Sequence, residues 1–233
     1  QYADSPWAKT QKFIKIAAPN NKVAIQLFEE NKMKILGIYA KAERDRLVSI
    51  YKRTADSRIF NLFKKKYDML LYCPTGYYIN KDTTDFVWIS SETKKDSKGI
   101  IFFTEKYEHE SQFNHVIIVD RVNEELEKFI PGPRNGSYMA LDTEIPYTFV
   151  QYKYNGHYAV SVRGLWTVVN DFMAGPFVLN VVLDEEHQRV IYMMGYVYYP
   201  NEEKRDMLKQ VEAILNTMVI DFKEKEQQQE TKK

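Results

Sequence analysis

Apolar positions in the first quarter of the chain recur at helical spacing. Across residues 22–53, apolar side chains fall at spacings of three and four (Ala24, Leu27, Phe28 and Ile35, and then Leu47, Ile50 and Tyr51). The preceding Pro19-Asn20-Asn21 is typical of a helix start, and Gly37 is a position where the helix could kink or break. Asp56, a good N-cap residue, predicts a second helix that ends in three lysines. One strand, residues 12–17, is expected before these helices.

From residue 69 onward the pattern changes to short apolar runs closed by turn residues, which predicts strands at 69–73, 86–89, 100–103, 147–154, 158–169, 177–183 and 189–198. Asn155-Gly156 is the strongest two-residue hairpin signal and joins the fourth and fifth of these strands. In residues 189–198 both alternating sets are apolar. A strand of that kind is covered on both faces, so we expect it at the centre of its sheet.

Two more helices complete the pattern. Residues 111–130 carry one apolar face, and Asn201 with two following acids predicts the start of a closing helix. Residues 223–233 are charge- and Gln-rich without apolar periodicity, which predicts a disordered tail. The chain is therefore expected to be α+β, a mostly antiparallel sheet with helices packed on it after a helical N-terminal region. We divide it into a strand plus helical region (1–67), the sheet with two packed helices (68–220) and the tail (221–233).

Composition narrows the class of protein. The chain has 233 residues, 44% hydrophobic and 28% charged, as in an ordinary soluble globular protein. Its formal net charge of +1 gives no electrostatic reason to expect nucleic acid as a partner. No apolar run approaches the roughly 18–20 residues that span a bilayer. The chain begins at Gln1 rather than at Met, so we expect further sequence upstream, with which the strand at residues 12–17 pairs unless it stands at a sheet edge.

Catalytic and metal motifs are weak. Cys73, the only cysteine, lies at a predicted strand end and is interpreted as a buried structural thiol. The four histidines lack metal-ligand spacing, so neither a metal nor a cofactor is expected. Acids such as Asp184 are interpreted as turn and surface residues, and His187 as an exposed turn histidine.

Two Gly- and Pro-rich segments, residues 130–139 and 162–177, carry the candidate site. Its residues are large amphipathic or charged side chains: Arg134, Tyr138, Arg163, Trp166 and Asp171. If they converge, arginine would bind an anion or carboxylate between aromatic walls. The rival interpretation is a buried ion pair of Arg163 with Asp142, Asp171 or Asp184, with Trp166 filling the core.

The same segments, together with Phe86-Val87-Trp88 and Tyr198-Tyr199-Pro200, resemble an uncharacterised family of bacterial cell-envelope proteins. That family is known only as a domain of unknown function and is frequent in Bacteroides-like bacteria. The resemblance implies a periplasmic or outer-membrane lipoprotein whose lipid anchor lies outside this chain, without an assigned activity, cofactor or catalytic residue. The order of elements is also similar to the α-β-α sandwich of photosystem extrinsic subunits.

These observations leave three kinds of function open. We favour a non-catalytic binding or accessory module of the envelope, whose partner is an envelope component or a small anionic ligand. The alternative is an envelope hydrolase acting on glycan or peptide, with Asp171 and Glu144 near Arg163. A subunit that contributes only an interface would instead show a contiguous exposed apolar patch.

Overall fold

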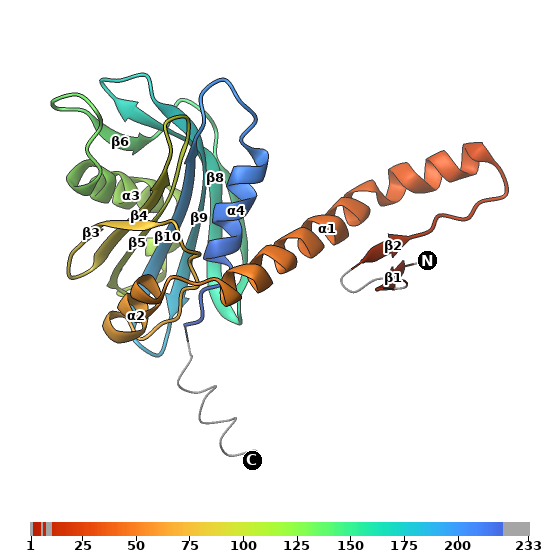
Figure 1. Cartoon of the computed structure of the whole chain (residues 1–233), viewed down its shortest axis with the longest axis horizontal. Helices are drawn as coiled ribbons and strands as arrows, with labels where there is room; N and C mark the ends of the chain where they lie inside the picture. The colour runs from red at the N-terminus through yellow and green to blue at the C-terminus, as the bar shows by residue number, and fades with distance from the viewer. Residues whose placement is uncertain (1, 6, 8–10, 221–233) are drawn as a thin grey trace, which may run out of the picture.

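The computed structural model describes residues 2–5, 7 and 11–220. Within these residues eight strands form one antiparallel sheet in the order β3-β4-β5-β10-β9-β8-β6, with β7 also paired to β8. The strands are β3 (Tyr78–Asp82), β4 (Phe86–Glu92), β5 (Ser97–Lys106), β6 (Tyr138–Leu141), β7 (Thr148–Tyr154), β8 (His157–Val169), β9 (Ala174–Asp184) and β10 (Arg189–Tyr198). Helices cover both faces of the sheet (Figure 1), which confirms the α+β class and gives it an α-β-α layering.

The predicted central strand is confirmed. β10 lies between β5 and β9 and pairs with both in antiparallel register. Tyr192 and Met194 pack under one helical layer, whereas Met193 and Val197 pack under the other. Both alternating sets are apolar because both faces of this strand are buried.

One face of the sheet is covered by α3 (His115–Phe129), whose Ile118, Val122 and Leu126 are buried. Asn114 caps this helix and also ends a short 3-10 helix, η1 (Glu110–Phe113), so the single helix expected from residue 111 is in fact two elements. The aromatic rings of Phe103 and Tyr192 stack under α3 with centroids 4.4 Å apart.

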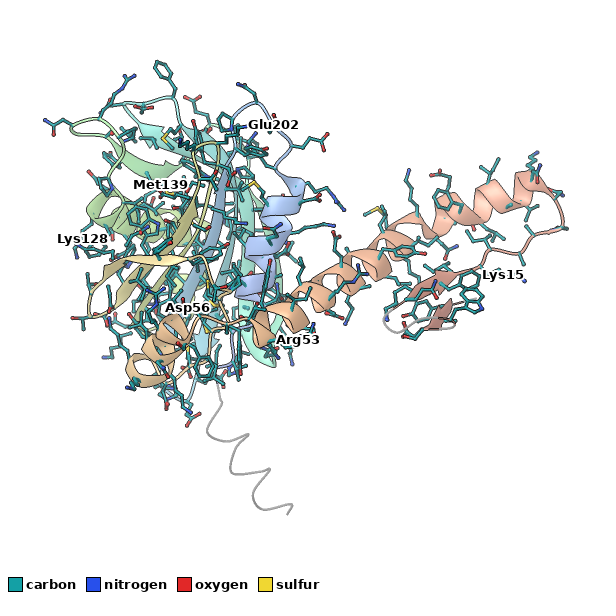
Figure 2. All side chains as sticks on the ribbon, in the orientation of Figure 1. Lys15, Arg53, Asp56, Lys128, Met139 and Glu202 are labelled. Atoms are coloured by element: carbon teal, nitrogen blue, oxygen red, sulfur yellow. The ribbon has the colours of Figure 1, made fainter. Side chains whose placement is uncertain are left out.

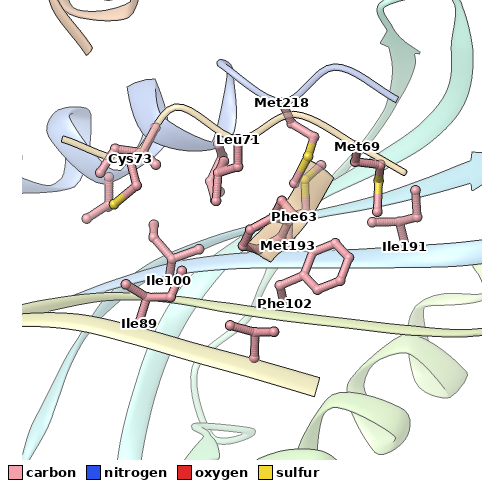
Figure 3. Packing of buried hydrophobic residues seen from close by; sticks show 14 of the residues in the cluster. Phe63, Met69, Leu71, Cys73, Ile89, Ile100, Phe102, Ile191, Met193 and Met218 are labelled. Carbon is pink, nitrogen blue, oxygen red and sulfur yellow. The ribbon is translucent and has the colours of Figure 1, made fainter. Parts of the chain in front are cut away.

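The other face is covered by α2 (Ser57–Lys66) and α4 (Arg205–Leu215). Figure 3 shows Phe63 of α2 packed near Phe102 and Met193 of the sheet. The expected strand at residues 69–73 is wrong, because the segment forms one isolated β-bridge, from Leu70 to Val219. The segment is nevertheless buried between the helices and the sheet, which accounts for its apolar sequence.

α1 (Asn21–Arg53) forms a long arm with the small hairpin of β1 (Tyr2–Asp4) and β2 (Lys12–Ile14). Figures 1 and 2 show α1 leading away from the rest of the molecule, with the hairpin lying along it. Asn20 caps the helix through Val23 N–H, as expected, and Gly37 does not interrupt it. Among the described strands β2 pairs with β1 alone, so it stands at an edge. We call β1, β2 and α1 the arm, and residues 54–220 the body.

Several element boundaries differ from the sequence-based expectation. The closing helix begins at Arg205 and not near Asn201, which has a left-handed backbone (φ 61°) incompatible with a cap. β3 was missed because its side chains are all exposed, and β6 because it has four residues. The expected tail at residues 223–233 lies outside the described residues. No helix within the described residues has both the length and the apolar content to cross a bilayer.

Candidate functional site

The two Gly- and Pro-rich segments meet at one end of the sheet. β6 pairs with the last part of β8, with Tyr138 opposite Val169. The loop before β6 is closed by Gly132 N–H donating to the Ser137 carbonyl over 2.8 Å. The Asn170 side chain donates to the Gly136 carbonyl over 3.3 Å and joins the two loops. Their convergence thus follows from strand pairing and loop hydrogen bonds.

At this junction Arg134 and Asp171 form an ion pair, with Nε and Oδ2 2.9 Å apart. The Arg134 guanidinium also lies over the ring of Phe172, 5.3 Å from its centroid. Phe172 N–H donates to Asp171 Oδ1 over 2.6 Å, while 89% of Phe172 is exposed. We call Arg134, Asp171 and Phe172 the loop cluster. It presents an apolar ring to solvent on a braced backbone.

The other candidate residues lie elsewhere. Arg163 faces the α4 side of the sheet and pairs with Glu212 of that helix, so the expected partners Asp142, Asp171 and Asp184 are wrong. Trp166 faces the α3 side, is buried, and donates Nε1–H to the Val197 carbonyl over 3.2 Å. Trp166 lies three positions after Arg163 on the same strand, and an odd offset puts two side chains on opposite faces.

Tyr138 also points away from Trp166. It alternates with Met139 and Leu141, which are buried under α3, so its ring lies on the opposite face of β6. The five candidates therefore do not line one pocket. Arg134 and Asp171 meet, and Arg163 and Trp166 stand apart from them and from each other.

This geometry gives the hydrolase alternative no support. Its two acids were expected near Arg163, but Asp171 is engaged by Arg134 and Arg163 by Glu212. Glu144 lies in a turn whose backbone N–H is accepted by Asp142 Oδ1 over 3.0 Å, and its position is exposed. A glycosidase requires two carboxyls facing each other across a cleft.

The residues that the sequence misjudged most are at the β9–β10 turn. Asp184, expected on the surface, is fully buried. Its carboxylate accepts from Arg189 Nε over 2.7 Å and lies 2.9 Å from His187 Nδ1. Arg189 in turn donates to the Tyr67 carbonyl at the end of α2 over 2.8 Å. The sequence contains a signal for this ion pair, because Asp184 and Arg189 are opposite each other in the predicted hairpin.

Burial alone would raise the pKa of Asp184, but the hydrogen bonds from Arg189 and His187 outweigh it and hold the pKa below its usual value. Asp184 is therefore ionised at neutral pH. With Arg189 and His187 it ties the β9–β10 turn to the end of α2, which is a structural role.

A groove of about 730 Å³ lies beside this turn, lined among others by Lys66, Thr104, Glu105 and His187. His187 Nδ1 is held by Asp184, an orientation that general-base histidines share. Its Nε2, however, lies 3.9 Å from the Asp68 carboxylate instead of a hydroxyl or thiol. The groove therefore shows a paired histidine without an activated nucleophile.

Cys73 is fully buried, and burial raises the pKa of its thiol far above the usual value. It is a core residue, seen among other apolar side chains in Figure 3. Within the residues that the structure describes, no three His, Cys, Asp or Glu side chains are placed to hold a metal ion.

Comparison with known proteins adds a family. The family described as a domain of unknown function (DUF4837) matches residues 56–217, and a search of curated proteins gave no match. Among solved structures, the chain is similar to that of LpqN, involved in cell envelope biogenesis of Mycobacterium tuberculosis. The TM-score is 0.38 with 10% identity, over 65% of this chain and 82% of that chain. The family match covers the sheet with α2, α3 and α4, and leaves out the arm.

Proposed function

The chain belongs to the family of the domain of unknown function DUF4837, and on that premise we propose that it is a non-catalytic binding module of the bacterial cell envelope. In this proposal the body presents the loop cluster to a protein partner. The observation that carries it is Phe172, 89% exposed on a loop that Arg134, Asp171 and Asn170 brace.

An exposed phenylalanine on a braced loop suits a binding anchor. Aromatic and arginine side chains dominate the energetics of protein interfaces. A loop already fixed by hydrogen bonds loses less conformational entropy on binding than a mobile one. Arg134 and Arg163 already pair with carboxylates of this chain, which favours a protein surface over a small anionic ligand.

The envelope location rests on the resemblance of residues 130–139, 162–177 and 198–200, all within the matched region. We propose further that the full protein is a lipoprotein of Bacteroides-like bacteria, anchored through sequence outside this chain. Cys73 cannot be the anchoring residue because it is fully buried in the core. Metabolic labelling of the protein, expressed from its own gene, with a palmitate analogue tests the anchor; an unlabelled protein contradicts it.

The binding role is tested by photo-crosslinking in cells. A photoreactive phenylalanine analogue replaces Phe172, and in a matched control it replaces Tyr78, an exposed aromatic residue of β3. We expect a discrete adduct from position 172 that is absent from position 78. Excess unlabelled protein should diminish this adduct, and excess Phe172→Ala protein should not. No adduct at 172, or the same adducts at both positions, would contradict the proposal.

A further inference from the structure

α1 exposes an apolar face that the fold leaves uncovered. Large apolar side chains recur along it at eleven-residue spacing, Ile25 to Leu36 and Phe28 to Tyr39 to Ile50. Eleven residues make three turns of 3.67 residues each, so these side chains form a nearly straight row. We call these five residues the α1 stripe. Ile25 is 65% exposed and Leu36 53% exposed.

Apart from the exposed Met33, the other sides of α1 are packed against the same chain or polar. The hairpin lies along a second apolar face, where Ile14 and Leu27, Ile35 and Ile38 line a cavity of about 430 Å³. The last turns pack on the body through Tyr51 and through Glu43, which pairs with Lys209 of α4. A third side is polar and carries Lys41 and Lys52.

An exposed apolar stripe of this length is unusual for a helix that functions alone. Helices that are apolar on several sides are normally buried on each of them. The stripe extends over 25 helical steps, roughly 38 Å at 1.5 Å per residue. Lys32 and Glu43 interrupt the row, since each lies four positions from a stripe residue, but an exposed apolar surface of that extent still marks an interaction site.

We propose that the stripe binds the stripe of a second copy of this chain, the two α1 helices running antiparallel about a two-fold axis between Gly37 and Ile38. In this register Ile25 faces Ile50 and Leu36 faces Tyr39, each pair occurring twice. A two-fold interface requires self-complementarity of this kind.

Charge complementarity selects this arrangement. The same register puts Glu29 opposite Arg46, so these two charges beside the stripe meet opposite charges. It also puts Lys32 opposite Glu43, which already pairs with Lys209 of its own chain. A parallel pair would place each of them against its own copy and oppose like charges. Like charges brought together across an interface cost affinity and suppress the wrong pairing.

Other occupants fit the stripe less well. Residues 221–233 contain a single large apolar side chain, Phe222, too few for a row of five. A lipid-binding helix carries mainly Lys and Arg beside its apolar face. Here the charged residues in and beside the stripe are of both signs: Glu29, Glu43, Lys32 and Arg46.

Sedimentation velocity of the full chain tests the association. We expect a dimer that Leu36→Lys converts to monomer, whereas Lys41→Glu on the polar side leaves it intact. Because Leu36 is exposed in the single copy, its variant should keep the thermal unfolding temperature of the body. A monomeric wild-type chain at micromolar concentration, or a dimer indifferent to Leu36→Lys, overturns the proposal. A monomer that floats with anionic vesicles would instead make the stripe a lipid-binding face.

The register is tested by charge reversal. Glu29→Arg alone and Arg46→Glu alone each oppose like charges twice per dimer, and we expect dimerisation to weaken roughly tenfold. The double variant restores the opposite-charge contacts and should recover most of the loss. Failure of this rescue overturns the register even if the chain dimerises.

The direction is tested by a spin label on Gln26→Cys, since the natural thiol is buried. In the antiparallel pair, position 26 lies opposite position 49 of the other copy. The two labelled backbones are then roughly 35 Å apart along the helices. A parallel pair would hold them at roughly 10 Å, and that distance would overturn the proposal.

Discussion

The arm and the body contain similar proportions of apolar side chains but bury them to different extents. In the body, apolar residues of both sheet faces are enclosed by α3 on one side and by α2 and α4 on the other. In the arm, only Ala42 and Tyr51 of a 33-residue helix are buried. An apolar pattern thus predicts that a surface is covered, but not whether the same chain covers it.

The family match follows the same division, since it begins at Asp56, the N-cap of α2, and ends at Thr217. The loop cluster belongs to the matched body and the α1 stripe does not. The two surfaces can therefore be tested separately, and the following substitutions probe how far the arm and the body differ in stability.

The largest difference in stability is expected between removing a buried ion pair of the body and removing an exposed one of the arm. Asp184→Ala leaves Arg189 without its buried carboxylate, so we expect the free energy of unfolding to fall by roughly 3–5 kcal/mol. Asp45→Ala, which removes an exposed pair with Lys41 on α1, should cost roughly 0.5 kcal/mol or less. Urea denaturation followed by circular dichroism measures both. Equal losses in the two variants would contradict the distinction between body and arm.

Acid sharpens the same contrast. The pKa of Asp184 is lower in the folded protein than in the unfolded chain, where it is about 4. Ionised Asp184 therefore makes its full contribution to the free energy of unfolding at pH values above about 4. That contribution is lost as the pH falls through the folded pKa. The stability gap between wild type and Asp184→Ala should consequently narrow below about pH 4. Denaturant midpoints of both proteins, measured across this pH range, give the stability difference. A difference that widens on acidification would mean that folding raises the pKa of Asp184.

Replacing a glycine by alanine should lower stability in the body and raise it in the arm. A Cβ on Gly175 would collide with the Val197 carbonyl oxygen, so Gly175→Ala should destabilise the protein by roughly 1–3 kcal/mol. A Cβ on Gly37 meets nothing within 4 Å, so Gly37→Ala should stabilise α1 by up to about 1 kcal/mol. Calorimetry and the helical circular dichroism signal report the two. Destabilisation by Gly37→Ala would mean that this position packs closely against a partner.

The smallest expected difference is in the hydrogen exchange of backbone amides, which reports local opening of the fold. Amides of β10 should exchange with solvent only through global unfolding, because both strand neighbours and both helical layers enclose it. Amides near Ile25 and Leu36 should exchange faster in dilute solution. If α1 pairs with a second copy, their protection rises with protein concentration while that of β10 does not. Uniform protection at every concentration would place the arm in the same cooperative unit as the body.

The candidate site was predicted only in part. The Gly/Pro segments pointed to the loops that converge, and Arg134 and Asp171 were among the residues named. Phe172 was overlooked, although an aromatic residue directly after Asn170-Asp171, in a hairpin turn, has little room in a sheet interior. Arg163 and Trp166 were grouped by proximity in sequence, whereas strand alternation sends them to opposite faces.

Local pattern alone determined the helix starts at Asn20 and Asp56, the Asn155-Gly156 hairpin and the central place of residues 189–198. Capping, turn conformation and two-sided burial depend on residues within a few positions of each other. Tertiary structure decided that Asp184 is buried, that Arg163 pairs with Glu212, and that residues 69–73 are core without being a strand. Asp184 meets Arg189 within one hairpin, but its burial depends on the end of α2, where Arg189 donates to the Tyr67 carbonyl. The other two outcomes depend on groups brought together from distant parts of the chain, and no local spacing encodes their meeting.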